Sequence, residues 1–254
     1  MKDKKTSWGN VASWYDETLS KEDTFQSKVI LPNLLRILPP EKGKRIIDIA
    51  CGQGFFSKIY AEGGGEVLGV DISSELIKIA QKNESEKLRF KVANAQKISG
   101  VKDESFDSAL IILALQNIKD MPEAVKEASR VLVKNGKLVI VLNHPCFRVL
   151  KGSSWEFDEK EGVQYRRVDK YGVPFSVEVD MNPGAKPIHK KVKTVSFHRP
   201  LQDYFKALNK ANFVVSGLEE WISHKQSQSG PRAVAEDRSR KEFPMFLAII
   251  AEKR

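Results

Sequence analysis

A glycine-rich segment at residues 48–54 contains the residue types that could hold a cofactor. It reads Asp-Ile-Ala-Cys-Gly-Gln-Gly and lies between a run of apolar residues and a segment with helical spacing. Glycine lets a backbone turn sharply and approach a ligand where a Cβ would stand in the way. The segment therefore predicts a loop that binds a nucleotide-like molecule.

The residues around this loop exclude the two common phosphate-binding loops. A dinucleotide fingerprint reads Gly-x-Gly-x-x-Gly, but here Ser57 stands at the third glycine position, behind Phe55 and Phe56. The two rings fill the space that a pyrophosphate needs at the helix N-terminus. No Gly-Lys-Ser or Gly-Lys-Thr follows, so the segment is not a P-loop either. We expect a ligand that brings no phosphate to this turn.

An acidic residue, Asp71, ends the next apolar run, seventeen residues after Gly54. A carboxylate there can accept both hydroxyl hydrogens of a ribose, which contributes about 1–3 kcal/mol to binding. A free 2′,3′-diol without a phosphate at the glycine turn is what S-adenosylmethionine presents. Asp48, beside the turn, could attract the ammonium group of such a ligand or order the amides of the loop. Helix capping or turn formation is the alternative explanation for both carboxylates.

Short apolar runs alternate with amphipathic segments along most of the chain. Strands are expected at 45–50, 66–70, 88–92, 106–113 and 137–142, after a helix at 24–38. Helices are expected at 55–62, from residue 73 onward and at 121–133. Continuous apolar strands that alternate with helices predict an α/β protein with a parallel sheet covered on both faces.

The pattern changes at residues 144–199, which contain several glycines and prolines and short alternating runs. We interpret this segment as an inserted arm of hairpins and loops that covers the substrate. Residues 1–143 would supply the N-terminal helices and the cofactor-binding half of the domain. Residues 200–254 would complete the same domain with a helix and two strands, near 213–221 and 245–251.

Five segments between residues 40 and 143 resemble, in register, the motifs of class I S-adenosylmethionine-dependent methyltransferases. They are residues 46–54, 67–73, 93–95, 105–107 and 129–138. The pair Tyr15-Asp16 is similar to the N-terminal segment of the small-molecule subgroup, such as the quinone-biosynthesis enzymes. The resemblance implies a doubly wound, seven-stranded, mostly parallel sheet, the Rossmann-like methyltransferase fold, with the arm inserted after strand five. It also implies S-adenosylmethionine as cofactor and in-line methyl transfer to a small organic molecule.

The expected cofactor-binding residues follow the predicted strands. They are Asp48, Ala50, Cys51, Gly52, Gly54, Asp71, Ile72, Asn94, Ala95, Leu113 and Gln116. Two positions depart from the family pattern. Asn94 replaces an Asp that meets the adenine amino group, although its side-chain carbonyl can accept the same bond. Gln116-Asn117 stands where the family often has a pair of histidines.

Candidate substrate residues lie in the segments expected to overhang the cofactor. The aromatic candidates are Trp14, Tyr15, Phe147 and Trp155, and plain packing is the alternative explanation for each. His144 directly follows the fifth strand and is the candidate general base, since neutral imidazole titrates near working pH. The alternative is a histidine that is only hydrogen-bonded in a loop before a proline.

The 254 residues include 42 basic and 33 acidic ones, a net charge of +9, which favours an acidic partner. That partner could be an anionic small molecule, our first choice, or RNA; oligomeric state stays open. Two cysteines, no apolar run of membrane-spanning length and no signal peptide predict a cytoplasmic protein. No metal-site spacing is present, so no metal is predicted. The alternatives are an RNA-modifying methyltransferase of the same fold, using Lys190, Lys191, Lys193 and Arg199 on phosphates, and a non-catalytic cofactor-binding regulatory protein.

Overall fold

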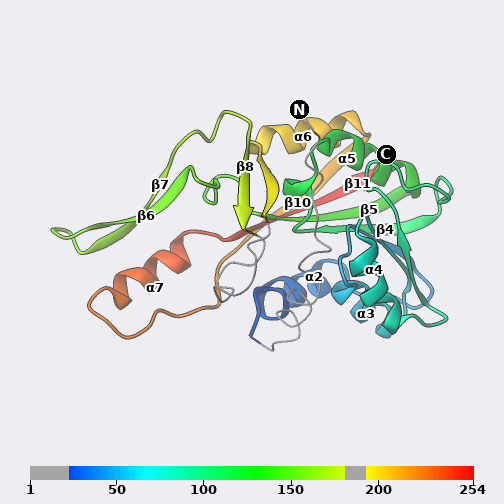
Figure 1. Ribbon diagram of the computed structural model, residues 1–254, viewed down its shortest axis with the longest axis horizontal. Coiled ribbons are helices and arrows are strands. Elements are labelled where there is room, and N and C mark those ends of the chain that lie inside the picture. Colours follow the sequence, from blue (N-terminus) through cyan, green and yellow to red (C-terminus); the bar gives the residue numbers. More distant parts are fainter. Residues whose placement is uncertain (1–22, 181–192) are drawn as a thin grey trace.

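The computed structural model describes residues 23–180 and 193–254. They form a seven-stranded sheet with helices on its faces (Figure 1). The strand order is β10-β11-β5-β4-β1-β2-β3. The strands are β1 (Arg45–Ile49), β2 (Glu66–Asp71), β3 (Leu88–Val92), β4 (Phe106–Ile112), β5 (Leu132–Asn143), β10 (Phe213–Trp221) and β11 (Phe246–Lys253). Only β11 runs antiparallel to its neighbours, β5 and β10. This confirms the predicted doubly wound, mostly parallel sheet.

The central strand β1 explains where a ligand can bind. Four of its five residues are buried, as expected of a strand with helices over both faces. Its residue Asp48 lies opposite Gly69 of β2 on one side and Leu110 of β4 on the other. From β1 the chain thus adds β2 and β3 on one side of this strand, and then β4 on the other side of it. In open α/β sheets, such a switch point opens a crevice at the carboxyl ends of the strands.

Helices cover both faces of the sheet (Figure 1). On one face, α2 (Leu31–Ile37), α3 (Phe55–Glu62) and α4 (Ser74–Ala80) bury residues such as Leu34, Tyr60 and Ile77. On the other, α5 (Met121–Val131) and α6 (Leu201–Lys210) bury Val125 and Leu208 against the strands. The two apolar cores therefore make β1, β4 and β5 a rigid platform for the loops at their ends.

Three elements differ from the sequence prediction. The helix expected at 24–38 is a short π-helix (Gln26–Ile30) followed by α2, at whose start Pro32 has no N–H to donate. Strand β5 begins at Leu132 instead of residue 137, and it contains an irregularity before Lys137, where Asn135 has a φ of +61°. Helix α7 (Ala233–Glu242) was not predicted at all, because its charged residues show little amphipathic pattern.

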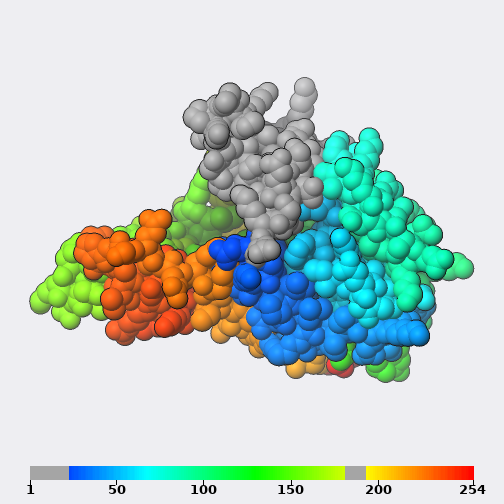
Figure 2. Space-filling model, turned by 90° about the horizontal axis from the view of Figure 1, so that it is seen from below, coloured from blue at the N-terminus to red at the C-terminus, as the bar shows by residue number. Residues whose placement is uncertain are grey.

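The arm contains the hairpin β6 (Ser153–Asp158) and β7 (Val163–Val168) and the antiparallel pair β8 (Phe175–Asp180) and β9 (Lys193–His198). Figure 2 shows the β6–β7 hairpin (lime) and α7 (orange) on the same side of the molecule. Ser239 of α7 donates its hydroxyl hydrogen to the carbonyl of Gln164 on β7. The projecting part of the arm thus uses residues from both 144–199 and 200–254. None of the described helices has the length and apolarity needed to cross a bilayer.

Candidate active site

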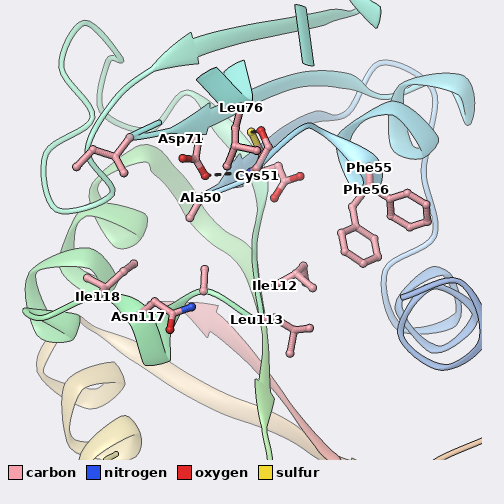
Figure 3. A pocket seen from close by; sticks show the side chains of 14 residues that line it. Ala50, Cys51, Phe55, Phe56, Asp71, Leu76, Ile112, Leu113, Asn117 and Ile118 are labelled. Atoms are coloured by element: carbon pink, nitrogen blue, oxygen red, sulfur yellow. Dashed lines mark hydrogen bonds between the residues drawn. The ribbon is translucent and has the colours of Figure 1, made fainter. Parts of the chain in front are cut away.

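A cleft of about 800 Å³, measured with its open mouth, lies at the carboxyl ends of β1, β2 and β4. In Figure 3, Ala50, Asp71 and Leu76 stand on one side of it and Leu113, Asn117 and Ile118 on the other. The lining residues are Asp48, Ala50, Cys51, Gly52, Phe55, Phe56, Asp71, Ile72, Leu76, Ile112, Leu113, Ala114, Asn117 and Ile118. The volume and the mainly apolar walls with a few polar groups are typical of a small-molecule site.

The loop between β1 and α3 has left-handed backbone at every second residue. Its φ angles are +59° at Ala50, +60° at Gly52 and +80° at Gly54. The Cys51 N–H donates to the carbonyl of Val70 at 3.0 Å, which fixes the loop against β2. A Cβ on Gly54 would lie 2.4 Å from the Phe90 ring. Gly54 therefore allows the loop to pack on the sheet, and it does not line the cleft.

Asp71 holds two loops together at the edge of the cleft. Its Oδ2 accepts the Gly52 N–H at 3.0 Å, the dashed line in Figure 3, and its Oδ1 accepts the Ser73 N–H at 2.8 Å. Each carboxylate oxygen has a second lone pair, so Asp71 can accept two further hydrogen bonds from a ligand. The side chain is buried, which raises the pKa of this carboxyl above its ordinary value.

Asp48 lies beneath the glycine loop and adds a second carboxylate to the site. It is 2% exposed, and its Oδ2 accepts the hydroxyl hydrogen of Ser57 at 2.6 Å. Burial, and then the nearby charge of Asp71, raise the pKa of Asp48 to about 6. No cationic side chain in the described part of the chain pairs with either carboxylate. The floor of the cleft therefore favours a ligand that carries positive charge.

Cys51 is a packing residue in this arrangement. Burial, and then the charges of Asp48 and Asp71, raise the pKa of its thiol well above the ordinary value. A thiol that stays protonated is a poor nucleophile. Its Sγ also lies 2.9 Å from the place where a Cβ on Gly69 would stand. The glycine in β2 thus makes room for the sulfur atom.

The opposite wall is formed by the turn after β4. Leu113 has a φ of +54°, and its N–H donates to the Val141 carbonyl of β5 at 2.7 Å. The short 3₁₀-helix η4 (Leu115–Asn117) follows and brings Asn117 and Ile118 to the cleft. Arg199, at the end of the arm, fixes this turn from behind. Its guanidinium donates to the carbonyls of Leu115 (3.2 Å), Ile118 (2.7 Å) and Lys119 (2.7 Å).

The structure brings together seven of the eleven predicted cofactor-binding residues. Asp48, Ala50, Cys51, Gly52, Asp71, Ile72 and Leu113 line the cleft, whereas Gly54, Asn94, Ala95 and Gln116 do not. The Gln116 side chain turns back to donate to the Leu113 carbonyl at 2.7 Å. The exposed Asn94 accepts the Gln96 N–H at 2.9 Å, so its contact with adenine stays a prediction.

Sequence reasoning missed half of the lining. The missed residues are Phe55, Phe56, Leu76, Ile112, Ala114, Asn117 and Ile118. All but Asn117 are apolar and would fit positions in the hydrophobic core equally well, so their residue type does not indicate a ligand site. Only the position of some directly after a strand or at a helix start could have indicated them. Asn117 stands beside the predicted Gln116, and a 3₁₀-helix turns about 120° per residue, so the two side chains face different ways.

His144 lies outside the cleft lining, at the end of β5. It is 2% exposed, and its Nε2 lies 2.7 Å from Oε1 of Glu220. Its Nδ1 accepts the Cys146 N–H at 3.2 Å. Burial lowers the pKa of His144 below its ordinary value, partly offset by the hydrogen bond to Glu220. A neutral imidazole at pH 7 follows.

The predicted aromatic substrate residues are divided between two places. Phe147 packs against His144, with ring centroids 4.8 Å apart, and Trp155 packs edge-on against Phe243. Trp14 and Tyr15 lie outside the described residues. Residues 23–180 and 193–254 contain no group of three or more His, Cys, Asp or Glu side chains placed to hold a metal.

Residues 47–140 match the model of a protein family described as a methyltransferase domain. This part of the chain is therefore similar to a methyltransferase domain. A crystal structure of an S-adenosylmethionine-dependent methyltransferase from Mesorhizobium loti is similar over 91% of this chain and 100% of its own, with a TM-score of 0.71 and 25% identity. The sheet and its cleft thus confirm the fold that residues 46–54 and 67–73 predicted.

Two curated relatives show which methyltransferases the domain resembles. A demethylmenaquinone methyltransferase of Renibacterium salmoninarum is 30% identical over 142 residues, 54% of this chain and 58% of the relative. A ubiquinone biosynthesis O-methyltransferase of Xanthomonas oryzae is 27% identical over 101 residues, 39% of this chain and 42% of the relative. The chain therefore matches about half the length of each.

Proposed function

We propose that this protein is an S-adenosylmethionine-dependent methyltransferase that acts on a small organic molecule. The observation that carries the proposal is the pairing of Asp71 with the glycine loop at the switch point of the sheet. The carboxylate has lone pairs left for a ribose diol, and no phosphate-binding motif stands beside it. The methyltransferase-domain match over residues 47–140 supports the same cofactor.

The cleft fits the other parts of this cofactor. Asp48, beneath the loop, supplies negative charge near the place where an amino-acid tail with an ammonium group would lie. Ile72 is 56% exposed and lines the cleft next to Asp71, so it offers an apolar surface to a flat base. Burying that side chain would contribute about 1 kcal/mol or more to binding. The residues present therefore match a nucleoside with a cationic tail.

The bound cofactor would supply an electrophilic methyl group for in-line displacement. The chain's own part in such a reaction is alignment and the exclusion of water. His144 remains the candidate base for an acceptor that arrives protonated. Glu220 accepts its Nε2–H, which leaves the lone pair on Nδ1. The Cys146 N–H donates to this lone pair at 3.2 Å and would have to move away before Nδ1 could take a proton. A carboxylate that orients an imidazole in this way is a common feature of general bases.

The acceptor is proposed to be a small, anionic molecule handled in the cytoplasm. The two curated relatives carry the names of quinone-pathway methyltransferases, which supports a small acceptor. The net charge of +9 favours an acidic one. Both cysteines are free thiols, which suits a reducing compartment.

The RNA hypothesis draws less support from the arm. Lys193 pairs with Glu178 at 3.7 Å, and Arg199 is engaged by three backbone carbonyls. Lys190 and Lys191 lie outside the described residues. A steep loss of RNA affinity with salt would favour that hypothesis. Label that stays on bound cofactor in a cell-metabolite extract would favour the non-catalytic hypothesis.

The test of the proposed function is Asp71→Ala. We expect its affinity for S-adenosylmethionine, measured by calorimetry, to fall by about 1–3 kcal/mol, because a charged hydrogen-bond acceptor is lost. Circular dichroism checks that the fold survives. Asp107→Ala is the matched control, since that carboxylate lies at the opposite end of β4 and pairs with Arg45. Equal affinity in the Asp71 variant and the wild type would contradict the ribose assignment.

A further inference from the structure

We propose that Arg148 and Arg166, at the base of the arm, bind a carboxylate or phosphate group of the methyl acceptor. The proposal rests on the proposed function and names the chemical class of its substrate. The two residues come from different segments: Arg148 follows β5, and Arg166 lies on β7. The fold brings their side chains together on one aromatic ring.

That ring is Trp155 of β6. The guanidinium carbon of Arg148 lies 5.8 Å from its centroid, and that of Arg166 lies 4.9 Å from it. Phe243 packs edge-on against Trp155, and Phe147 packs edge-on against Phe243. These rings form an apolar wall behind the two cations. Charges beside such a wall are weakly screened, so an anion that reaches them is bound more strongly than at an open surface.

Neither cation is neutralised by a carboxylate within residues 23–180 and 193–254. In the described part of the chain, the Arg148 guanidinium donates no hydrogen bond and forms no ion pair. Arg166 donates its Nε to the Phe147 carbonyl (2.9 Å) and its Nη2 to the Ser153 hydroxyl (2.6 Å), both neutral acceptors. Its Nη1 keeps both N–H groups available. The exposed arginine of the arm differs, since Arg167 pairs with Asp169.

The surroundings of Arg148 make a positive charge without a carboxylate partner unfavourable. Burial, and then the charges of Arg166 and Arg240, lower the pKa of Arg148. Arg240 is itself compensated by Glu236 and Asp237. A half-buried cation pair without a carboxylate is unfavourable unless a ligand completes it. An oxyanion of the substrate would do so.

The backbone of Arg148 connects to the β5 side of the cofactor cleft. The Arg148 N–H donates to the His144 carbonyl at 2.8 Å, and His144 follows β5 directly. Val141, three residues earlier, accepts the N–H of Leu113, a residue of the cleft wall. Three strand residues span about 10 Å. In this proposal, an acceptor anchored by its anion at the base of the arm extends past His144 toward the cleft.

The geometry of a guanidinium group matches carboxylate and phosphate oxygens alike. The experiment therefore tests both kinds of anion. A nucleic-acid backbone is the less favoured occupant. Phosphate backbones are usually bound by exposed rows of Lys and Arg, whereas this pair is half-buried between aromatic rings. The observations therefore favour one anionic group on a small molecule.

The experiment measures binding of benzoate, phenyl phosphate and neutral benzamide by calorimetry. We expect the wild type to bind at least one of the two anions, and Arg148→Gln to bind it about tenfold more weakly or worse. Arg148 carries the main test because its guanidinium donates no hydrogen bond within the described residues. Arg166→Gln should show the same loss, with thermal unfolding measured alongside because its bonds support the hairpin. Arg167→Gln, the exposed neighbour, is the control and should bind like the wild type.

Several results would overturn the proposal. These are equal binding of benzamide, unchanged anion affinity in Arg148→Gln, and no anion binding by the wild type. Salt-sensitive binding of a short oligouridylate that needs Arg148, without binding of the small anions, would point to nucleic acid instead. Preference for benzoate or phenyl phosphate identifies the source of the anion. The affinity for S-adenosylmethionine is measured separately. If the wild type does not bind S-adenosylmethionine, the proposed function is contradicted, while the anion-binding result remains valid.

Discussion

The Nε2 atom of His144, the residue directly after β5, lies 2.7 Å from Oε1 of Glu220 on β10, two strands away in the sheet. The imidazole is buried, while the carboxylate side chain of Glu220 is 49% exposed. Burial lowers the pKa of His144, so the ring is neutral at pH 7 and donates its Nε2–H to the carboxylate. The lone pair is thereby left on Nδ1. Glu220 thus selects the tautomer in which Nε2 carries the hydrogen and Nδ1 is the atom that would accept a proton.

The first prediction concerns His144→Gln. If the imidazole is the general base, turnover should fall by about 10²–10⁴-fold. In the wild type, kcat/KM should decline below pH 6.5, because the histidine pKa lies under that ordinary value. This acid limb should vanish in the variant. A variant that keeps the limb and changes only KM would show that His144 merely positions its neighbours.

Glu220→Gln tests the partner of the same histidine. As a positioning residue, Glu220 should shift the acid limb to lower pH when its charge is removed, since the carboxylate favours protonated imidazole. Glu219→Gln is the matched control, because that carboxylate pairs with Arg36 and the Trp221 indole instead. A limb that stays in place in Glu220→Gln would contradict the proposed orientation.

Asp48→Asn should stabilise the protein while weakening cofactor binding. The folded-state pKa is about 6 against an ordinary value of 3.8, so ionised Asp48 costs about 3 kcal/mol of stability. The cost is absent below pH 3.8, grows as the pH rises and is complete above about 6. The variant should therefore unfold at a higher urea concentration than the wild type at pH 7 and match the wild type near pH 3.5. Urea unfolding at both pH values measures this, and equal stability at pH 7 would refute it.

Gly54→Ala should destabilise the fold by about 1–3 kcal/mol, because a φ of +80° strains any residue with a Cβ. The new methyl group would also lie 2.4 Å from the Phe90 ring. Phe90→Leu in the same chain should restore part of the loss by opening that space. A double-mutant cycle followed by urea unfolding gives the coupling. Additive effects would mean that the ring is not the obstacle.

Arg199→Lys should loosen the turn that carries Asn117 and Ile118. Lysine cannot reproduce the guanidinium fork over three carbonyls, so we expect a loss of about 1–3 kcal/mol in the free energy of unfolding. Cofactor affinity should fall as well, because both residues line the cleft. Thermal unfolding and calorimetry report the two effects. A variant with wild-type affinity and stability would show that the turn holds its shape without Arg199.

The strands and the glycine loop could be predicted because their signals are local. Buried runs such as 45–49 and the turn at 50–54 follow from the types of neighbouring residues alone. Helix α7 could not, because its ten residues are mostly polar and it packs on a hairpin some seventy residues earlier in the chain. Its position is set by tertiary contacts, which leave no period in the sequence.

The sequence by itself determined the alternating α/β order, the loop at 48–54 and the acidic residue after the second strand. Only the tertiary structure decided that Gly54 faces Phe90, that Asn117 rather than Gln116 enters the cleft, and that Arg148 meets Arg166 over Trp155. The reason is physical. Local backbone preferences act between residues a few positions apart, whereas the direction of a side chain depends on which distant elements pack beside it.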